Sequence, residues 1–259
     1  MESTFLIEGQ AGPSKIQSSA FLVLVRQPGI SPPTSRLVLV TAVHVLEQMQ
    51  GDVAVIHLRR RVRDRHKADQ ATKVWIQQNY QIQIRTNGRP LWARLATDDV
   101  AVMYFSPPPW FPKMLKPITP AMFAHEEFLS EYHVNPGDEV RFLGFKPTLS
   151  VSNEAGFPVL YGAKIDPTSD RTLGTAMTFL MPCDVCKGNS GGPVYLEGHA
   201  IGLHSIMGLL SEMDFGSGQF RGKFSGHVYH VTPMILVVVI HASVIKQSID
   251  LLLSQPCPN

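Results

Sequence analysis

The sequence predicts an all-β protein with two six-stranded antiparallel barrels followed by a short C-terminal helix. Two observations support this fold class. Short aliphatic and β-branched runs recur along the 259 residues, and glycine or proline turns separate them, which is typical of barrels. Six prolines fall within residues 106–120, and proline at that density cannot continue a central strand. This stretch therefore divides the chain into two halves.

The first half contains five apolar runs that we interpret as strands. Residues 81–85 alternate strictly between polar and apolar and lead into Asn87-Gly88, a strong hairpin signal. The five expected strands cover residues 21–25, 37–41, 53–58, 81–85 and 100–105.

The second half repeats this pattern and ends differently. Its expected strands cover residues 139–144, 158–161, 193–196 and 200–204. From residue 242 to 253 the apolar spacing becomes helical, so we expect a helix that packs on the second barrel. The predicted domains are a first barrel at 1–110, a second barrel at 111–241, and a helix with its tail at 242–259.

Composition and charge narrow the class of protein. Hydrophobic residues make up 44% and charged residues 17% of the chain, an ordinary globular balance that excludes disorder. The net charge of +2 is too near neutral to indicate a nucleic-acid partner. A basic run at residues 59–67 could meet an anionic partner, or it could be a solvated loop between two strands.

The cysteines and the apolar segments indicate a cellular compartment. Three cysteines give no even disulfide set, so we expect a reducing environment. Cys183 and Cys186 have a metal-type spacing but lack a second pair, and we expect neither a metal nor a cofactor. Residues 1–8 do not resemble a secretion signal, and the run 234–240 is too short to span a bilayer. We therefore expect a cytoplasmic protein with no membrane partner.

Residues 188–193 (GNSGGP) carry the sharpest chemical signal. A serine nucleophile must stand out of a tight turn, with backbone N–H groups directed at the oxyanion that forms on attack. Glycine permits such a turn and a close approach of the substrate. The pattern therefore indicates a nucleophile at Ser190, and a plain glycine-rich hairpin is the structural alternative.

This motif resembles the active-site segment of chymotrypsin-like serine peptidases, in the form typical of bacterial trypsin-like and Deg-type enzymes. Residues 41–44 (TAVH) and 99–102 (DVAV) resemble that family's histidine and aspartate segments, in the same chain order. The resemblance covers residues 18–240. No peptide-binding PDZ domain is expected after residue 254, unlike in Deg-type proteins.

The resemblance implies a role for each matched residue. Ser190 would attack the scissile carbonyl, His44 would accept its proton, and Asp99 would orient the imidazole. Asp98 is a rival to Asp99, which we prefer because it directly precedes the apolar strand. The N–H groups of Gly188 and Ser190 would form the oxyanion hole. His44 taken alone would be read as a core histidine, and the three segments in order overturn that reading.

Three further residues concern substrate binding. In trypsin-like members, an aspartate at the position of Asp184 lies at the base of the primary pocket and selects Arg or Lys. His204 lies where glutamate-specific and some viral relatives place a substrate-reading histidine, which favours Glu or Gln. Both residues could instead be structural. Ser205 matches a serine that hydrogen-bonds the triad aspartate, or it is an ordinary strand serine.

The expected activity is endoproteolysis of a protein or peptide substrate through an acyl-enzyme. Asn189 replaces the aspartate that pairs with a freed N-terminus in digestive enzymes, so we expect control by a regulatory partner or by loop ordering. One alternative is a non-catalytic protein-binding module of the same fold. Another is a processing protease in a bacterial defence system, an analogy with the family alone.

Overall fold

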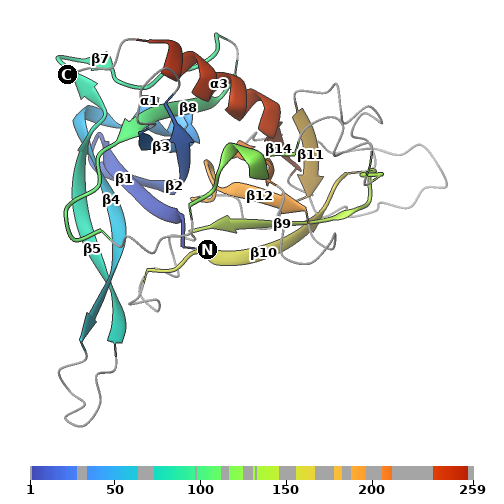
Figure 1. Ribbon diagram of the computed structural model, residues 1–259, viewed down its shortest axis with the longest axis horizontal. Helices are drawn as coiled ribbons and strands as arrows, with labels where there is room; N and C mark the ends of the chain where they lie inside the picture. The colour runs from blue at the N-terminus through green and yellow to red at the C-terminus, as the bar shows by residue number, and fades with distance from the viewer. Residues whose placement is uncertain are drawn as a thin grey trace, which may run out of the picture.

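The computed structural model describes residues 2–27, 34–63, 73–96, 98–111, 117–124, 131, 133–145, 156–166, 178–182, 188–196, 206–211 and 236–255. Over these residues the chain forms two six-stranded antiparallel sheets, a two-stranded hairpin and a helix near its C-terminus (Figure 1). The expected mostly-β class with a C-terminal helix is confirmed. No helix in the described part of the chain is long and apolar enough to span a membrane.

The first sheet has the strand order β5-β4-β1-β2-β3-β8. Its strands are β1 (Thr4–Ala11), β2 (Ser14–Arg26), β3 (Ser35–Ala42), β4 (Gln50–Arg63), β5 (Lys73–Gln83) and β8 (Val100–Phe105). The short strands β6 (Arg85–Thr86) and β7 (Arg89–Pro90) flank Asn87 and Gly88. Both turn residues have positive φ, at 51° and 76°, as the expected hairpin turn requires. Strand β1 was not predicted from the sequence.

The second sheet has the order β10-β9-β12-β13-β14-β11. Its strands are β9 (Glu139–Gly144), β10 (Val159–Lys164), β11 (Thr178–Pro182), β12 (Pro193–Leu196), β13 (Ile206–Ser211) and β14 (Leu236–His241). The strand expected at 200–204 lies outside the described residues. In the described ladders neither β5 with β8 nor β10 with β11 is paired, so the predicted barrel closure is not seen there.

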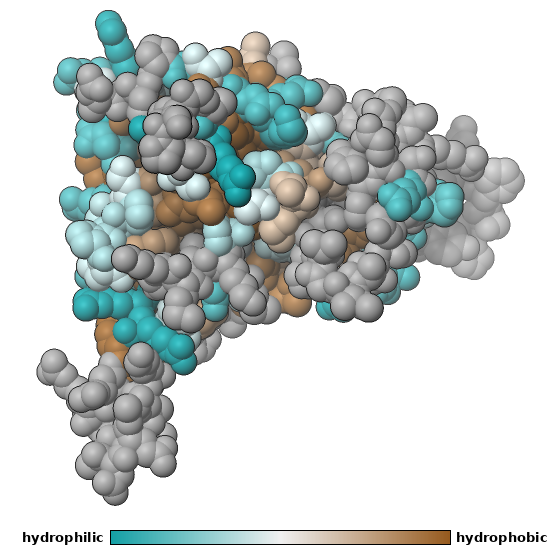
Figure 2. Space-filling model, in the orientation of Figure 1, coloured by the Kyte–Doolittle hydropathy of each residue, from teal (hydrophilic) through white to brown (hydrophobic). Residues whose placement is uncertain are grey.

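Each sheet buries its own set of apolar side chains. Fully buried Phe5, Phe21 and Leu39 belong to the core of the first sheet. Phe142 belongs to a second, smaller core and stacks on Tyr161, with ring centroids 4.8 Å apart. On the face shown in Figure 2, hydrophilic residues lie around the outside of the part that holds the first sheet, and hydrophobic residues show between them. The first core also includes Phe111, Ile118 and Phe123 from the proline-rich stretch and the segment after it, and Ile240 from the end of β14.

Helix α3 (Ala242–Ser254) forms where the sequence predicts it, and it contacts both sheets. It follows β14 and lies across the top of the molecule toward β8 (Figure 1). Val244, Ile245 and Ile249 are buried within the core of the first sheet. The helix contacts β13 and β14 of the second sheet, where we expected it to pack, and it also packs on β8 of the first sheet. Helical spacing shows which face is apolar, but it does not show which surface covers that face.

The basic run also differs from its predicted form. Residues 59–63 continue strand β4 and are not a loop. Arg59 is only 3% exposed, and its guanidinium lies over the rings of Phe5 and Phe157, at 4.5 Å and 4.8 Å. It donates hydrogen bonds of 2.7–2.8 Å to the main-chain oxygens of Glu2, Thr4 and Gly156. Burial lowers the pKa of Arg59 to about 10, so the side chain stays charged at neutral pH.

The first turn of α3 is capped by a buried histidine. The Nδ1 atom of His241 accepts the Ser243 N–H at 3.2 Å and lies 2.8 Å from the Ser243 hydroxyl. Accepting a hydrogen bond requires an unprotonated nitrogen. Burial lowers the pKa of His241 below its usual range, which keeps the ring neutral in the folded state. The cap therefore depends on pH.

We expect the His241→Asn variant to lose less stability than the wild type in mild acid. As pH falls below about 6.5, the unfolded state takes up a proton that the folded imidazole refuses, so wild-type stability declines until the folded pKa is reached. Asparagine also caps a helix but does not titrate. Urea unfolding between pH 7 and 5 should show a smaller decline in the variant than in the wild type. His133→Asn, at an exposed histidine, is the control, and an equal decline in all three proteins would contradict the expectation.

Candidate active site

The pairing of β3 with β8 brings two sequence-predicted residues together. Ala42 at the end of β3 is paired with Val100 at the start of β8. Helix α1 (Val43–Gln48) begins directly after β3 and carries His44, while Asp99 directly precedes β8. Residues 55 positions apart in sequence thus meet at one edge of the first sheet.

Asp99 makes two contacts with His44. One carboxylate oxygen, Oδ2, lies 2.6 Å from the imidazole Nδ1, and the other accepts the His44 main-chain N–H at 2.8 Å. Helix α1 has no capping side chain of its own, so Asp99 satisfies a free N–H of its first turn. The carboxylate orients the ring and the helix together. No described contact joins the Asp98 carboxylate to the imidazole. The main-chain N–H of Asp98 donates to the Leu95 carbonyl oxygen.

The second sheet supplies Ser190 through the turn that precedes β12. Ser190 is 2% exposed, and its main-chain oxygen accepts hydrogen bonds from two groups of β2. The Ser18 hydroxyl donates at 2.7 Å and the Ser19 N–H at 2.9 Å. No role was predicted for Ser18 or Ser19, although two adjacent serines directly before an apolar run are a usable signal.

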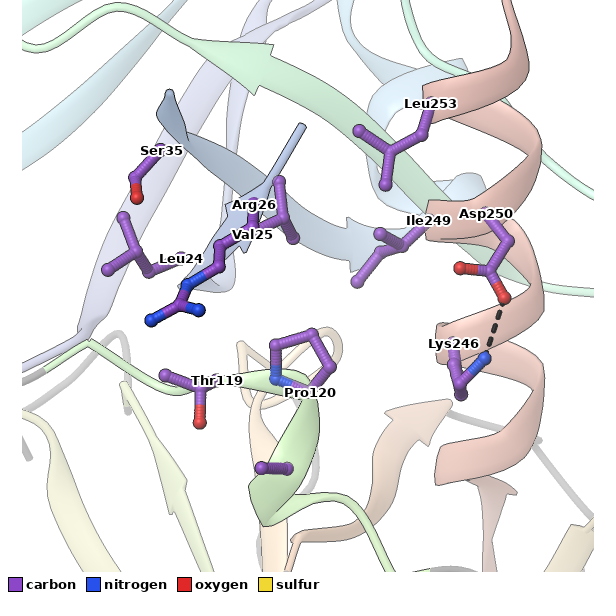
Figure 3. Close-up of a pocket in the computed structure, with 11 residues that line it drawn as sticks. Leu24, Val25, Arg26, Ser35, Thr119, Pro120, Lys246, Ile249, Asp250 and Leu253 are labelled. Carbon is purple, nitrogen blue, oxygen red and sulfur yellow. Dashed lines mark hydrogen bonds and ion pairs between the residues drawn. The ribbon is translucent and has the colours of Figure 1, made fainter. Parts of the chain in front are cut away.

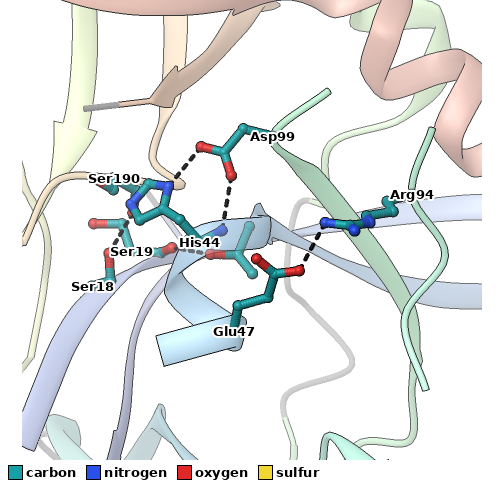
Figure 4. Close-up of polar contacts among 8 residues, drawn as sticks. Ser18, Ser19, His44, Glu47, Arg94, Asp99 and Ser190 are labelled. Atoms are coloured by element: carbon teal, nitrogen blue, oxygen red, sulfur yellow. Dashed lines mark hydrogen bonds and ion pairs between the residues drawn. The ribbon is translucent and has the colours of Figure 1, made fainter. Parts of the chain in front are cut away.

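Glycine at position 191 allows the turn to approach the end of β3. Gly191 has φ +82°, and a Cβ there would lie 2.2 Å from the Ser19 carbonyl oxygen and 3.1 Å from the Ala42 nitrogen. The turn therefore contacts the main chain two residues before His44. In the view of Figure 4, Ser190 is drawn on the side of the imidazole opposite Asp99. The described hydrogen bonds do not include one between the imidazole and the Ser190 hydroxyl, and such bonds are often long in unliganded sites.

Of the remaining predicted site residues, the structure describes Gly188 and not the three expected to bind substrate. Gly188, an expected oxyanion-hole residue, lies in the turn with φ +87°. Asp184, His204 and Ser205, the expected substrate-binding residues, lie outside the described residues. In the described part of the chain no group of three His, Cys, Asp or Glu residues could hold a metal ion.

A cavity of about 550 Å³ lies elsewhere, between β2, the short helix η1 (Pro120–Met122) and α3 (Figure 3). Leu24, Ile249 and Leu253 contribute apolar surface to it. Lys246 and Asp250 also line it and pair at 2.8 Å. None of His44, Asp99 and Ser190 lines this cavity, so its size does not make it the candidate active site.

Comparison with known families identifies the family of this chain. The sequence matches the trypsin family over residues 31–214, well over half of the chain. The chain belongs to the trypsin family. A comparison with curated proteins finds no sequence match. The sequence-based prediction of a trypsin-like family is thus confirmed. The bacterial or Deg-type branch of that family stays a prediction.

Several solved structures resemble this trypsin-family chain. The thermostable serine protease AL20 from an extremophilic microorganism is 12% identical, with 98% of each chain covered and a TM-score of 0.52. Human heparin binding protein is 11% identical, and the match covers 100% of this chain and 94% of that one with a TM-score of 0.51. A mutant of tobacco etch virus protease is 10% identical, with coverage of 100% and 80% and a TM-score of 0.50. At such identities the likeness shows the fold alone.

We expect Gly191→Ala to destabilise the trypsin-family fold far more than Gly51→Ala. The two glycines have similar φ, +82° and +79°, but a Cβ at Gly51 meets nothing within 4 Å. Both variants incur about 1–2 kcal/mol of left-handed strain. Only Gly191→Ala adds a clash with the main chain, for a total of roughly 3 kcal/mol or more. Urea unfolding measures both, and equal losses would show that the close approach is unimportant.

Proposed function

We propose that this trypsin-family protein is a serine endopeptidase that uses His44, Asp99 and Ser190 as its catalytic triad. The observation that carries the proposal is the 2.6 Å contact between the Asp99 carboxylate and the His44 imidazole. The turn that holds Ser190 is bonded to the same sheet. Family membership supports peptides as the class of substrate.

The proposed chemistry follows from these positions. The Ser190 hydroxyl attacks the scissile carbonyl and passes its proton to Nε2 of His44, while Asp99 holds the Nδ1 proton and stabilises the imidazolium. The N–H groups of Gly188 and Ser190 bind the oxyanion. His44 then protonates the leaving amine, and water hydrolyses the acyl-enzyme by the same route in reverse.

A fluorophosphonate probe tests the proposal directly, because it reacts only with an activated serine. We expect the wild-type protein to be labelled at Ser190 and Ser190→Ala to be unlabelled. Asp99→Asn keeps an oxygen that can accept the His44 N–H but favours the wrong tautomer, so labelling should slow by about four orders of magnitude.

Asp98→Asn is the matched control, since Asp98 is the neighbouring carboxylate and makes no described contact with His44. Its labelling rate should equal that of the wild type. Absence of labelling in wild-type protein that is folded by circular dichroism would contradict the proposed activity. A loss in Asp98→Asn and not in Asp99→Asn would reassign the triad.

We further propose cleavage after Arg or Lys, with Asp184 as the charged floor of the primary pocket. A buried carboxylate would select a basic side chain through a charge-assisted contact. A positional scanning peptide library measures the preference directly. Preference for Glu or Gln would transfer the specificity role to His204, which is the alternative assignment.

A binding module without catalysis is the second candidate. One similar structure is named for heparin binding and not for proteolysis. Strand β4 also exposes Arg60 and Arg61, whose guanidinium groups lie over the rings of Trp110 and Trp75 at 5.6 Å and 5.7 Å. The labelling experiment separates the two candidates, because a binding module needs no reactive serine.

A further inference from the structure

We propose that the side-chain hydroxyls of Ser18 and Ser19 are positioning residues that clamp the nucleophile turn of the second sheet onto strand β2 of the first. The inference rests on the proposed function, because it assigns a role in catalysis at that site. It concerns two residues that do not belong to the expected triad, oxyanion hole or substrate pocket.

The clamp consists of hydrogen bonds made by two buried serine hydroxyls (Figure 4). The Ser18 hydroxyl donates to the Ser190 carbonyl oxygen at 2.7 Å. The Ser19 hydroxyl donates to the Gly188 carbonyl oxygen at 3.1 Å and accepts the Phe145 N–H at 3.2 Å. Ser18 is 2% and Ser19 0% exposed. Water therefore does not compete strongly for these bonds, and they hold the turn as long as the protein is folded.

These bonds determine the orientation of the peptide groups on which Ser190 depends. A peptide group is planar and trans, so fixing its carbonyl oxygen also fixes the N–H of the next residue. The Gly188 and Ser190 oxygens are held by β2, and the Asn189 oxygen accepts the Gly192 N–H at 3.0 Å. Strand β2 thus holds the peptide groups on either side of the one that carries the Ser190 N–H, the proposed oxyanion donor, and the turn's own bond to Gly192 holds that middle group.

The turn needs such external support because of its own sequence. Gly188 and Gly191 both have positive φ, +87° and +82°, and glycine reaches many other conformations at little cost. Hydrogen bonds from a rigid strand select one of them. Strand β2 is paired with β3, and β3 leads into the helix that carries His44. The clamp therefore sets the position of Ser190 relative to its proposed base.

The two hydroxyls occupy an otherwise apolar part of β2. Residues 20–23 (AFLV) follow directly and are fully buried. Alanine or valine at positions 18 and 19 would bury apolar surface without needing a hydrogen-bond partner. The Ser190 carbonyl oxygen already accepts one hydrogen bond, from the main-chain N–H of Ser19. The Ser18 hydroxyl is therefore not needed to satisfy this oxygen, and its hydrogen bond serves to orient the Ser190 peptide group.

Enzyme kinetics at a temperature well below unfolding test the clamp. We expect Ser18→Ala to lower kcat for a peptide substrate by about 10- to 100-fold with KM nearly unchanged, because a small displacement of reacting groups is costly. Ser18→Thr, which keeps the hydroxyl, should recover most of kcat. The fluorophosphonate labelling rate should fall in parallel with kcat in Ser18→Ala.

Ser248→Ala is the matched control. Ser248 is also fully buried, and its hydroxyl has no hydrogen-bond partner among the described residues. A purely structural role for Ser18 would lower the melting temperature of Ser18→Ala and leave kcat as high as in Ser248→Ala. That result would overturn the proposal.

Hydrogen exchange separates failure of the clamp from failure of the proposed function. Amides of residues 188–192 should exchange faster in Ser18→Ala and in Ser19→Ala than in wild type or Ser248→Ala, whether or not the protein cleaves peptides. Unchanged exchange in both variants would overturn the clamp even in an active enzyme. A wild-type protein with a protected turn but no labelling would reject the proposed function, and with it the catalytic role of the clamp.

Discussion

The two sheets meet at the hydrogen bond from the Ser19 N–H to the Ser190 carbonyl oxygen, which is 2.9 Å long. The groups proposed for catalysis are divided between these sheets, so their relative position depends on this contact and its neighbours. Thr41 extends the network, because its hydroxyl donates to the Ser19 carbonyl oxygen at 2.8 Å. Strands β2 and β3 therefore present a single surface to the turn from the second sheet.

The main-chain segments around the Ser190 turn approach one another so closely that glycine is required at several positions. A Cβ at Gly192 would lie 2.1 Å from the Leu143 carbonyl oxygen, and one at Gly144 would lie 2.2 Å from the Asn189 side chain. Asn189 is itself fully buried. The glycines that surround Ser190 in sequence thus allow three main-chain segments to pack without intervening side chains. Backbone approach, as well as backbone flexibility, accounts for the glycine-rich motif.

Two other features connect the halves away from the site. Arg59 of β4 reaches the Gly156 carbonyl oxygen, just before β10. Helix α3 begins at the end of β14 and buries Ile245 and Leu252 in the core of the first sheet. The Tyr104 hydroxyl of β8 also lies 3.5 Å from the Leu252 oxygen. These contacts hold the two sheets in one arrangement and so support the shorter hydrogen bonds beside Ser190.

Local patterns in the sequence determined the strand-rich class, the hairpin at Asn87-Gly88, the C-terminal helix and the segments that carry His44, Asp99 and Ser190. Such features depend on residues close in the chain, through side-chain periodicity and turn chemistry. Tertiary structure alone decided the partner of α3, the burial of Arg59 within a basic run, and the contact of Ser18 and Ser19 with the serine turn. Each of these depends on a surface more than 90 residues away in sequence, and periodicity does not encode which distant surfaces fit together.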